Sequence, residues 1–101
     1  MYGCGMPDEE VVREVTASVA EFARCLEVAA PGWVTRLAEG HYRVEHAAAG
    51  LEIRLQPTGR RRIGLFDLPV LEARYRFIAG SPEARRRLLE HLDRGMQRGG
   101  G

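Results

Sequence analysis

Four runs of alternating apolar and polar residues, joined by short links, constrain the fold of this chain most. The runs cover residues 41–47, 51–57, 61–67 and 70–78. Alternation with a period of two is typical of a strand that buries one face. The links contain glycine or proline and are shorter than the roughly dozen residues that a crossover between parallel strands needs. The sequence therefore predicts an antiparallel meander.

Helical periodicity flanks this meander on both sides. Between residues 8 and 30 the apolar side chains recur at helical spacing within an arc of roughly 120°, and Pro31 with Gly32 ends the segment. Ser81 and Pro82 are residue types favoured at an N-cap and at the first helical position, so a second helix is predicted to follow them. Around Trp33 the pattern is compatible with either a short edge strand or a loop held by the indole.

These elements give the order α-β-β-β-β-α, with a possible fifth short strand near residues 33–38. Each strand has one apolar face and each helix one apolar stripe, so both helices are expected on one face of the sheet. The predicted fold is an α+β two-layer sandwich with an antiparallel meander sheet. A length of 101 residues fits one domain. We expect a flexible N-terminal arm at 1–7, the domain at 8–98 and a disordered tail at 99–101.

Composition excludes several chemistries. All 15 basic residues are arginine, so lysine Schiff bases, a phosphate-loop lysine and lysine general bases are excluded. Ser18 and Ser81 are the two serines that could act as nucleophiles. The formal net charge of +1 predicts no strong overall field for nucleic acid or a membrane, and we expect no membrane partner.

The two cysteines are too few for a disulfide framework, and no opening apolar stretch resembles a signal peptide. A cytoplasmic location is therefore expected. Cys4, between glycines, is predicted to be an accessible thiol, and Cys25 a buried structural one. His41 and His46 differ by five positions along one predicted strand, so they are expected on opposite faces. We expect neither a metal nor a cofactor.

A candidate interaction surface lies on the sheet face that points away from the helices. It comprises Arg43, Arg54, Phe66, Arg74 and Arg76, interleaved with glutamates. Such a face is either a solvated surface crossed by ion pairs or a docking surface. Because Tyr75 and Phe77 share the parity of the core residues, Phe66 is the one aromatic residue expected on this face. A single aromatic makes a poor stacking platform for nucleic acid.

The second helix carries a candidate anion-binding stripe at helical spacing, made of Arg87, His91, Arg94 and Arg98. This row could receive a phosphate or an acidic partner. Glu83 and Glu90 lie four residues before Arg87 and Arg94, an arrangement that partly neutralises the row. A solvated helix flank is the alternative interpretation.

The function that these observations favour is a small non-enzymatic interaction or accessory module. Its partner is expected to be a second copy or another protein, held through the open sheet face or a sheet edge. One alternative is a nucleic-acid or anion binder that uses surface arginines. Another is a small enzyme with a pocket between helix and sheet, in which Glu72, Asp67 or a histidine acts as acid or base.

Overall fold

The computed structural model describes residues 10–100, with side chains as far as residue 96. Within this range the chain forms five strands and two helices. In chain order they are β1 (Glu10–Val15), α1 (Val19–Ala29), β2 (Val34–Ala38), β3 (His41–His46), β4 (Ala49–Ile63), β5 (Phe66–Ala79) and α2 (Pro82–Gly100). Residues 1–7 and Gly101 lie outside the described residues, whereas residues 99 and 100, which we expected in a tail, belong to α2.

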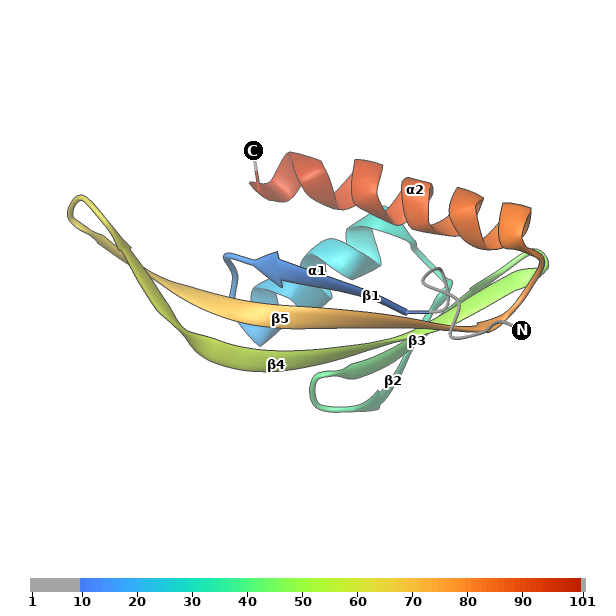
Figure 1. The fold of residues 1–101 in the computed structure, drawn as a ribbon, viewed down its shortest axis with the longest axis horizontal. Coiled ribbons are helices and arrows are strands. Elements are labelled where there is room, and N and C mark those ends of the chain that lie inside the picture. The colour runs from blue at the N-terminus through green and yellow to red at the C-terminus, as the bar shows by residue number, and fades with distance from the viewer. Residues whose placement is uncertain (1–9, 101) are drawn as a thin grey trace, which may run out of the picture.

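The strands form one open antiparallel sheet in the order β1-β5-β4-β3-β2. Both helices cover the same face of this sheet (Figure 1). The α+β class, the antiparallel meander and the single helical layer are thus confirmed, and β2 is the short strand considered near residues 33–38. Trp33 precedes this strand and packs against the core.

The first half of the predicted N-terminal helix is instead strand β1, which pairs with residues 71–76 of β5 at one edge of the sheet. Its valines are β-branched and suit a strand: Val11 and Val15 face the core, and Val12 points away from it. Helix α1 begins only after Ser18, in a capping box with Glu21. The Ser18 hydroxyl accepts from the Glu21 N–H at 3.1 Å, and the Glu21 carboxylate accepts from the Ser18 N–H at 2.9 Å.

We expected a turn at residues 57–59, between the runs 51–57 and 61–67, and this prediction is also wrong. Strand β4 continues through it as a β-bulge between Pro57 and Gly59, and the predicted link around Pro69 lies inside β5. The chain reverses at Gly64 and Leu65, where Gly64 supplies a φ of +58°. Three of the predicted strands, 51–57, 61–67 and 70–78, therefore belong to one long hairpin, which extends beyond the rest of the sheet (Figure 1).

The core lies between the sheet and the two helices. The helices contribute Phe22 and Leu26 from α1 and Leu88 and Leu92 from α2, all buried. The central strands contribute alternate residues, as the period of two predicted: Tyr42, Val44, Leu51, Ile53, Leu55, Leu71, Ala73, Tyr75 and Phe77. In residues 10–100 no helix is long and apolar enough to cross a membrane.

Candidate functional site

The projecting part of the β4–β5 hairpin, residues 57–70, carries three of the seven large apolar side chains that are exposed in the described chain. We call it the distal hairpin. Pairing of β5 with β1 stops at Leu71, and pairing of β4 with β3 stops at Arg54, so the distal hairpin is a two-stranded ribbon. At its tip Ile63 is 52%, Leu65 102% and Phe66 67% exposed. This gathering of exposed apolar side chains makes the tip a candidate contact site.

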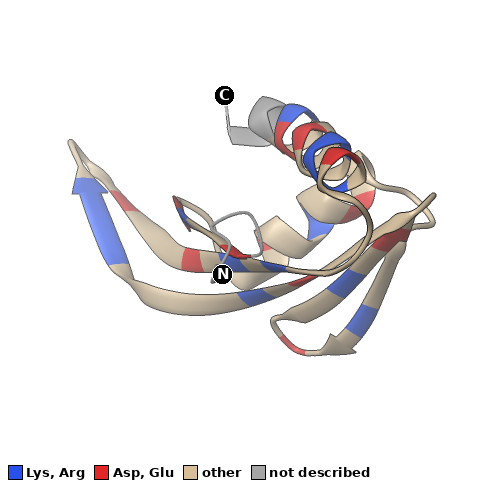
Figure 2. Ribbon diagram, turned by 45° about the vertical axis from the view of Figure 1, so that its right-hand side comes forward, with Lys and Arg blue, Asp and Glu red and all other residues tan. Residues whose placement is uncertain are grey.

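Three consecutive arginines lie directly behind this apolar tip, on the last part of β4 (Figure 2). Arg60 forms an ion pair of 3.1 Å with Asp67 across the hairpin. Arg61 reaches Glu14 of β1 at 2.7 Å. The second pair joins the ribbon to β1, and both pairs partly neutralise the positive charge of the ribbon.

Phe66 does not lie beside the four arginines with which the sequence analysis grouped it. It is the first residue of β5, at the tip of the hairpin. Arg74 is eight residues further along the same strand, which corresponds to roughly 26 Å at 3.3 Å per residue. The candidate interaction surface is therefore two separate areas, the apolar hairpin tip and the arginines of the open sheet face.

Arg43, Arg54, Arg74 and Arg76 lie on the sheet face that points away from the helices, across three neighbouring strands. Arg74 is engaged by Glu72 at 3.0 Å and by Glu10 at 3.3 Å. Arg54 and Arg76 form no ion pair with the residues that the structure describes. This face is thus a mixture of paired and unpaired cations.

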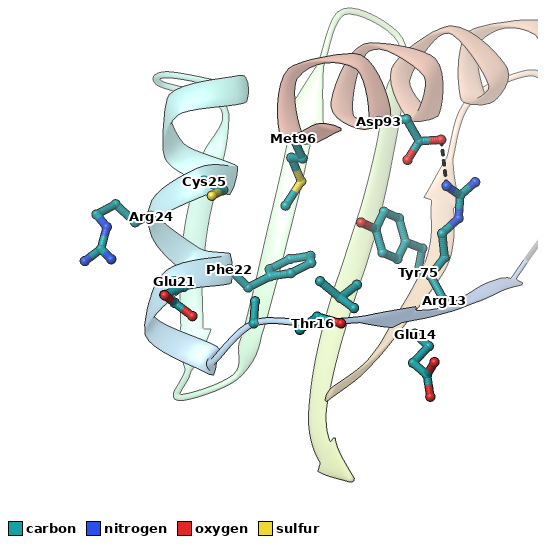
Figure 3. A pocket seen from close by; sticks show the side chains of 12 residues that line it. Arg13, Glu14, Thr16, Glu21, Phe22, Arg24, Cys25, Tyr75, Asp93 and Met96 are labelled. Carbon is teal, nitrogen blue, oxygen red and sulfur yellow. Dashed lines mark ion pairs between the residues drawn. The ribbon is translucent and has the colours of Figure 1, made fainter. Parts of the chain in front are cut away.

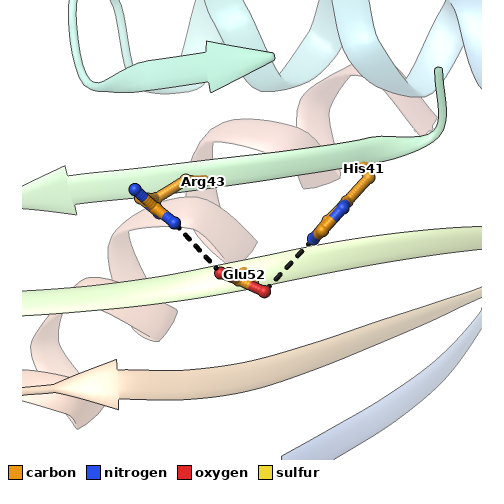
Figure 4. Close-up of polar contacts among 3 residues, drawn as sticks. All are labelled: His41, Arg43 and Glu52. Atoms are coloured by element: carbon orange, nitrogen blue, oxygen red, sulfur yellow. Dashed lines mark hydrogen bonds and ion pairs between the residues drawn. The ribbon is translucent and has the colours of Figure 1, made fainter. Parts of the chain in front are cut away.

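Glu52 is the centre of a small polar cluster on the same face (Figure 4). Its carboxylate lies 3.1 Å from Nε2 of His41 and 3.3 Å from Nη2 of Arg43. The hydrogen bond from His41, with a further contribution from Arg43, lowers the pKa of Glu52 below its usual value. The cluster therefore favours the ionised form of Glu52, whose carboxylate oxygens are already engaged by His41 and Arg43.

The members of the predicted anion-binding stripe have different surroundings. Arg87 pairs with Glu83 at 3.1 Å. His91 turns towards α1, where its Nε2 lies 2.8 Å from the backbone oxygen of Ala29. Arg94 is exposed, and the side chain of Arg98 lies outside the described residues. Two of the four positions are thus already engaged within the chain.

Trp33 and two histidines form an aromatic cluster on the helix side of the sheet. The Trp33 ring stacks on His46 with a centroid separation of 3.6 Å, and the His91 ring lies 4.7 Å away. His41 is on the opposite face, as the spacing along the strand predicted. No group of three or more potential metal ligands occurs in the part of the chain that the structure describes.

A pocket of about 500 Å³ lies between β1, β5 and the two helices (Figure 3). Its apolar lining includes Val15, Phe22 and Met96. At one end Nη1 of Arg13 contacts Oδ2 of Asp93 at 2.9 Å, so an ion pair joins β1 to α2. The small-enzyme alternative assumed a pocket between helix and sheet, and the structure has one there. Its lining contains neither Glu72, Asp67 nor a histidine, which the sequence analysis named as acid or base.

Tyr75 is the buried polar residue of this pocket, and its side chain is 3% exposed. Burial, with a smaller contribution from Asp93, raises the pKa of Tyr75 to about 12. The phenol therefore keeps its proton at neutral pH and is available as a hydrogen-bond donor. Parity along β5 predicted that Tyr75 is buried, but only the fold brings it close to Arg13 and Asp93.

Cys25 also lines the pocket and is a free, partly exposed thiol, whereas we expected it to be buried. It lies on α1 one turn after Phe22, close to Met96 (Figure 3). Cys4 lies outside the described residues. Comparison of the chain with protein-family models and with curated proteins found no match.

Proposed function

We propose that this protein is a small non-enzymatic interaction module that self-associates through the distal hairpin. The observation that carries the proposal is the exposure of Ile63, Leu65 and Phe66 at the end of a two-stranded ribbon. Full burial of such side chains contributes roughly 1.5–3 kcal/mol each. An ordered hairpin that leaves three of them in water gains from a contact that covers them.

A second copy of the chain suits this ribbon because of its free edges. Beyond Leu71 of β5 and Arg54 of β4 the described strands have no further neighbours, so backbone N–H and C=O groups are available on both edges. Two hairpins can pair about a two-fold axis, and each tip then packs against the other. Arg62 forms no ion pair with the described residues, whereas Asp67 is already held by Arg60, so Arg62 is the charge of the ribbon that a paired copy would meet.

The known ion pairs argue for the hairpin and against the centre of the open face as the main contact. Arg43 and Arg74 are already held by carboxylates within the chain. A partner that buried these pairs would have to remove their water without offering better partners. The tip carries no such cost, because its exposed side chains are apolar.

Sedimentation equilibrium of the wild-type protein and of a Leu65→Ser/Phe66→Ser variant tests the proposal. We expect a dimer at micromolar concentration for the wild type and at least a 100-fold weaker dimer for the variant. Val28→Ser is the matched control, because Val28 is 72% exposed but lies on α1, far from the hairpin in sequence. A wild-type monomer at all accessible concentrations, or an equal loss in the control, would contradict the proposal.

A further inference from the structure

The helix–sheet pocket has the size and lining of a small-molecule site. Its volume of about 500 Å³ falls within the range of roughly 300–1,000 Å³ that is typical of ligand pockets. Phe22 on α1 and Met96 on α2 form apolar walls, and Val15 of β1 adds to them (Figure 3). An apolar group of the size of one aromatic ring would be surrounded on several sides.

The Tyr75 hydroxyl is a hydrogen-bond donor that this pocket leaves without a partner. Figure 3 shows the phenol extending from β5 into the pocket, with its oxygen on the side of Met96. It forms no hydrogen bond with the described side chains or backbone. The hydroxyl oxygen is not among the fully buried polar atoms that lack a partner, so it opens to the pocket space, where it can donate to an acceptor. A ligand oxygen next to Tyr75 would supply that acceptor.

Four of the five charged residues of the lining have a partner of opposite sign or cap a helix, and the fifth, Arg24, extends away from the pocket (Figure 3). Arg13 is paired with Asp93, and Glu14 with Arg61. Glu21 caps the start of α1, and its hydrogen bonds with Ser18, with a smaller contribution from the charge of Arg24, lower its pKa. An anionic ligand near Tyr75 would face the Asp93 carboxylate, and a cationic one the Arg13 guanidinium. A neutral ligand avoids both repulsions.

We propose that the helix–sheet pocket binds a small neutral ligand with an apolar body and a carbonyl oxygen, which accepts a hydrogen bond from the Tyr75 hydroxyl. This ligand site is independent of self-association through the distal hairpin and adds a second binding activity to the module. Phe22 and Met96 hold the apolar body, and the Arg13–Asp93 ion pair closes one end of the pocket against ionised compounds.

Three probes with a single benzene ring separate these contributions: acetophenone has a neutral carbonyl, benzoate a carboxylate, and ethylbenzene no acceptor. Each is titrated into the full chain labelled with ¹⁵N and followed by NMR. We expect acetophenone to shift amides around Val15, Phe22 and Tyr75 with a dissociation constant on the order of 1 mM. Ethylbenzene should bind 2- to 10-fold more weakly, because it lacks the one hydrogen bond to Tyr75. Benzoate should bind more weakly still, because its carboxylate faces that of Asp93.

Two variants and a control locate the site. Tyr75→Phe should weaken acetophenone 2- to 10-fold and leave ethylbenzene unchanged. Tyr42→Phe is the matched control, because Tyr42 is also buried but lies on β3 outside the pocket lining. Thr16→Trp places a large ring at the exposed edge of the lining and should abolish binding of all three probes. This variant tests the location even where Tyr75→Phe alters folding.

Several results would overturn the proposal. No binding of any probe up to about 10 mM would show that the cavity is not a ligand site. Tighter binding of benzoate than of acetophenone would refute a neutral ligand. Equal binding of acetophenone to the wild type and a folded Tyr75→Phe variant would refute the role of the hydroxyl, and unchanged binding to Thr16→Trp would place the ligand elsewhere.

Discussion

Replacement of Gly95 by alanine tests the packing of α1 against α2 directly. Gly95 lies within α2, where alanine is ordinarily more favourable than glycine by about 0.8–1 kcal/mol. In this structure a Cβ atom at position 95 would lie 2.6 Å from the Ala29 Cβ and 3.1 Å from its Cα. Carbon atoms prefer separations of about 3.5–4.0 Å, so the two helices would have to move apart by roughly 1 Å.

The cost of this movement should exceed the gain in helix propensity. Neither Ala29 atom can rotate away, and separation of the helices loosens the packing of Leu26 and Leu92, which are both fully buried. Overpacking of this kind costs about 1–3 kcal/mol. We therefore expect a net loss of up to about 2 kcal/mol in the free energy of unfolding, measured by urea denaturation, and a lower melting temperature.

A double-mutant cycle with Ala29→Gly isolates the contact. Removal of the Ala29 Cβ leaves space for a Cβ at position 95, so Gly95→Ala should lose most of its cost in the Ala29→Gly background. If Gly95→Ala instead stabilises the wild-type protein by about 1 kcal/mol, as helix propensity alone requires, the close approach of the two helices is refuted.

Three further predictions concern the core, the pocket and the open face. Leu26→Ala and Phe77→Ala should each lower the free energy of unfolding by roughly 2–5 kcal/mol through cavities, and unchanged urea midpoints would show that these faces are misassigned. Since the pKa of Tyr75 is raised to about 12 from an unfolded value near 10, its contribution is complete below pH 10 and is lost as pH rises through 12. This loss, on the order of 2–3 kcal/mol, should disappear in Tyr75→Phe, and an equal alkaline loss in that variant would refute it. Arg54→Gln/Arg76→Gln should leave weak, salt-sensitive duplex DNA binding nearly unchanged in a fluorescence titration, whereas tight binding at physiological salt that the double variant loses would identify a nucleic-acid site.

The alternation of residues determined which side of each central strand is buried. Tyr75 and Phe77 share a parity and face the core, and Arg74 and Arg76 share the other parity and face away from it. A period of two is a local property of the extended backbone, so it needs no knowledge of the partner strands. The start of α2 could also be predicted from local sequence, because the Ser81 hydroxyl accepts a hydrogen bond from the N–H of Ala84, only three residues later.

Residues 10–15 show where local pattern stops being sufficient. Val11, Val12 and Val15 fit a helical face as well as a strand, and the pairing with β5, about 60 residues away in sequence, decides between them. A local signal for the boundary existed in Ser18 and Glu21, whose spacing is that of a capping box. The position of the hairpin turn was similarly ambiguous, because Gly59 and Gly64 both suit a turn and only the register of β4 on β5 makes the first a bulge.

The candidate sites depend on contacts between elements that are distant in sequence. Arg13, Tyr75 and Asp93 come from β1, β5 and α2, and their proximity follows from the order of strands and the placement of both helices on one face. The sequence by itself determined the faces of the central strands, since these follow from backbone periodicity. Only the tertiary structure decided the pocket, the projecting hairpin and the close approach at Gly95, because each depends on register and packing between segments that no local pattern relates.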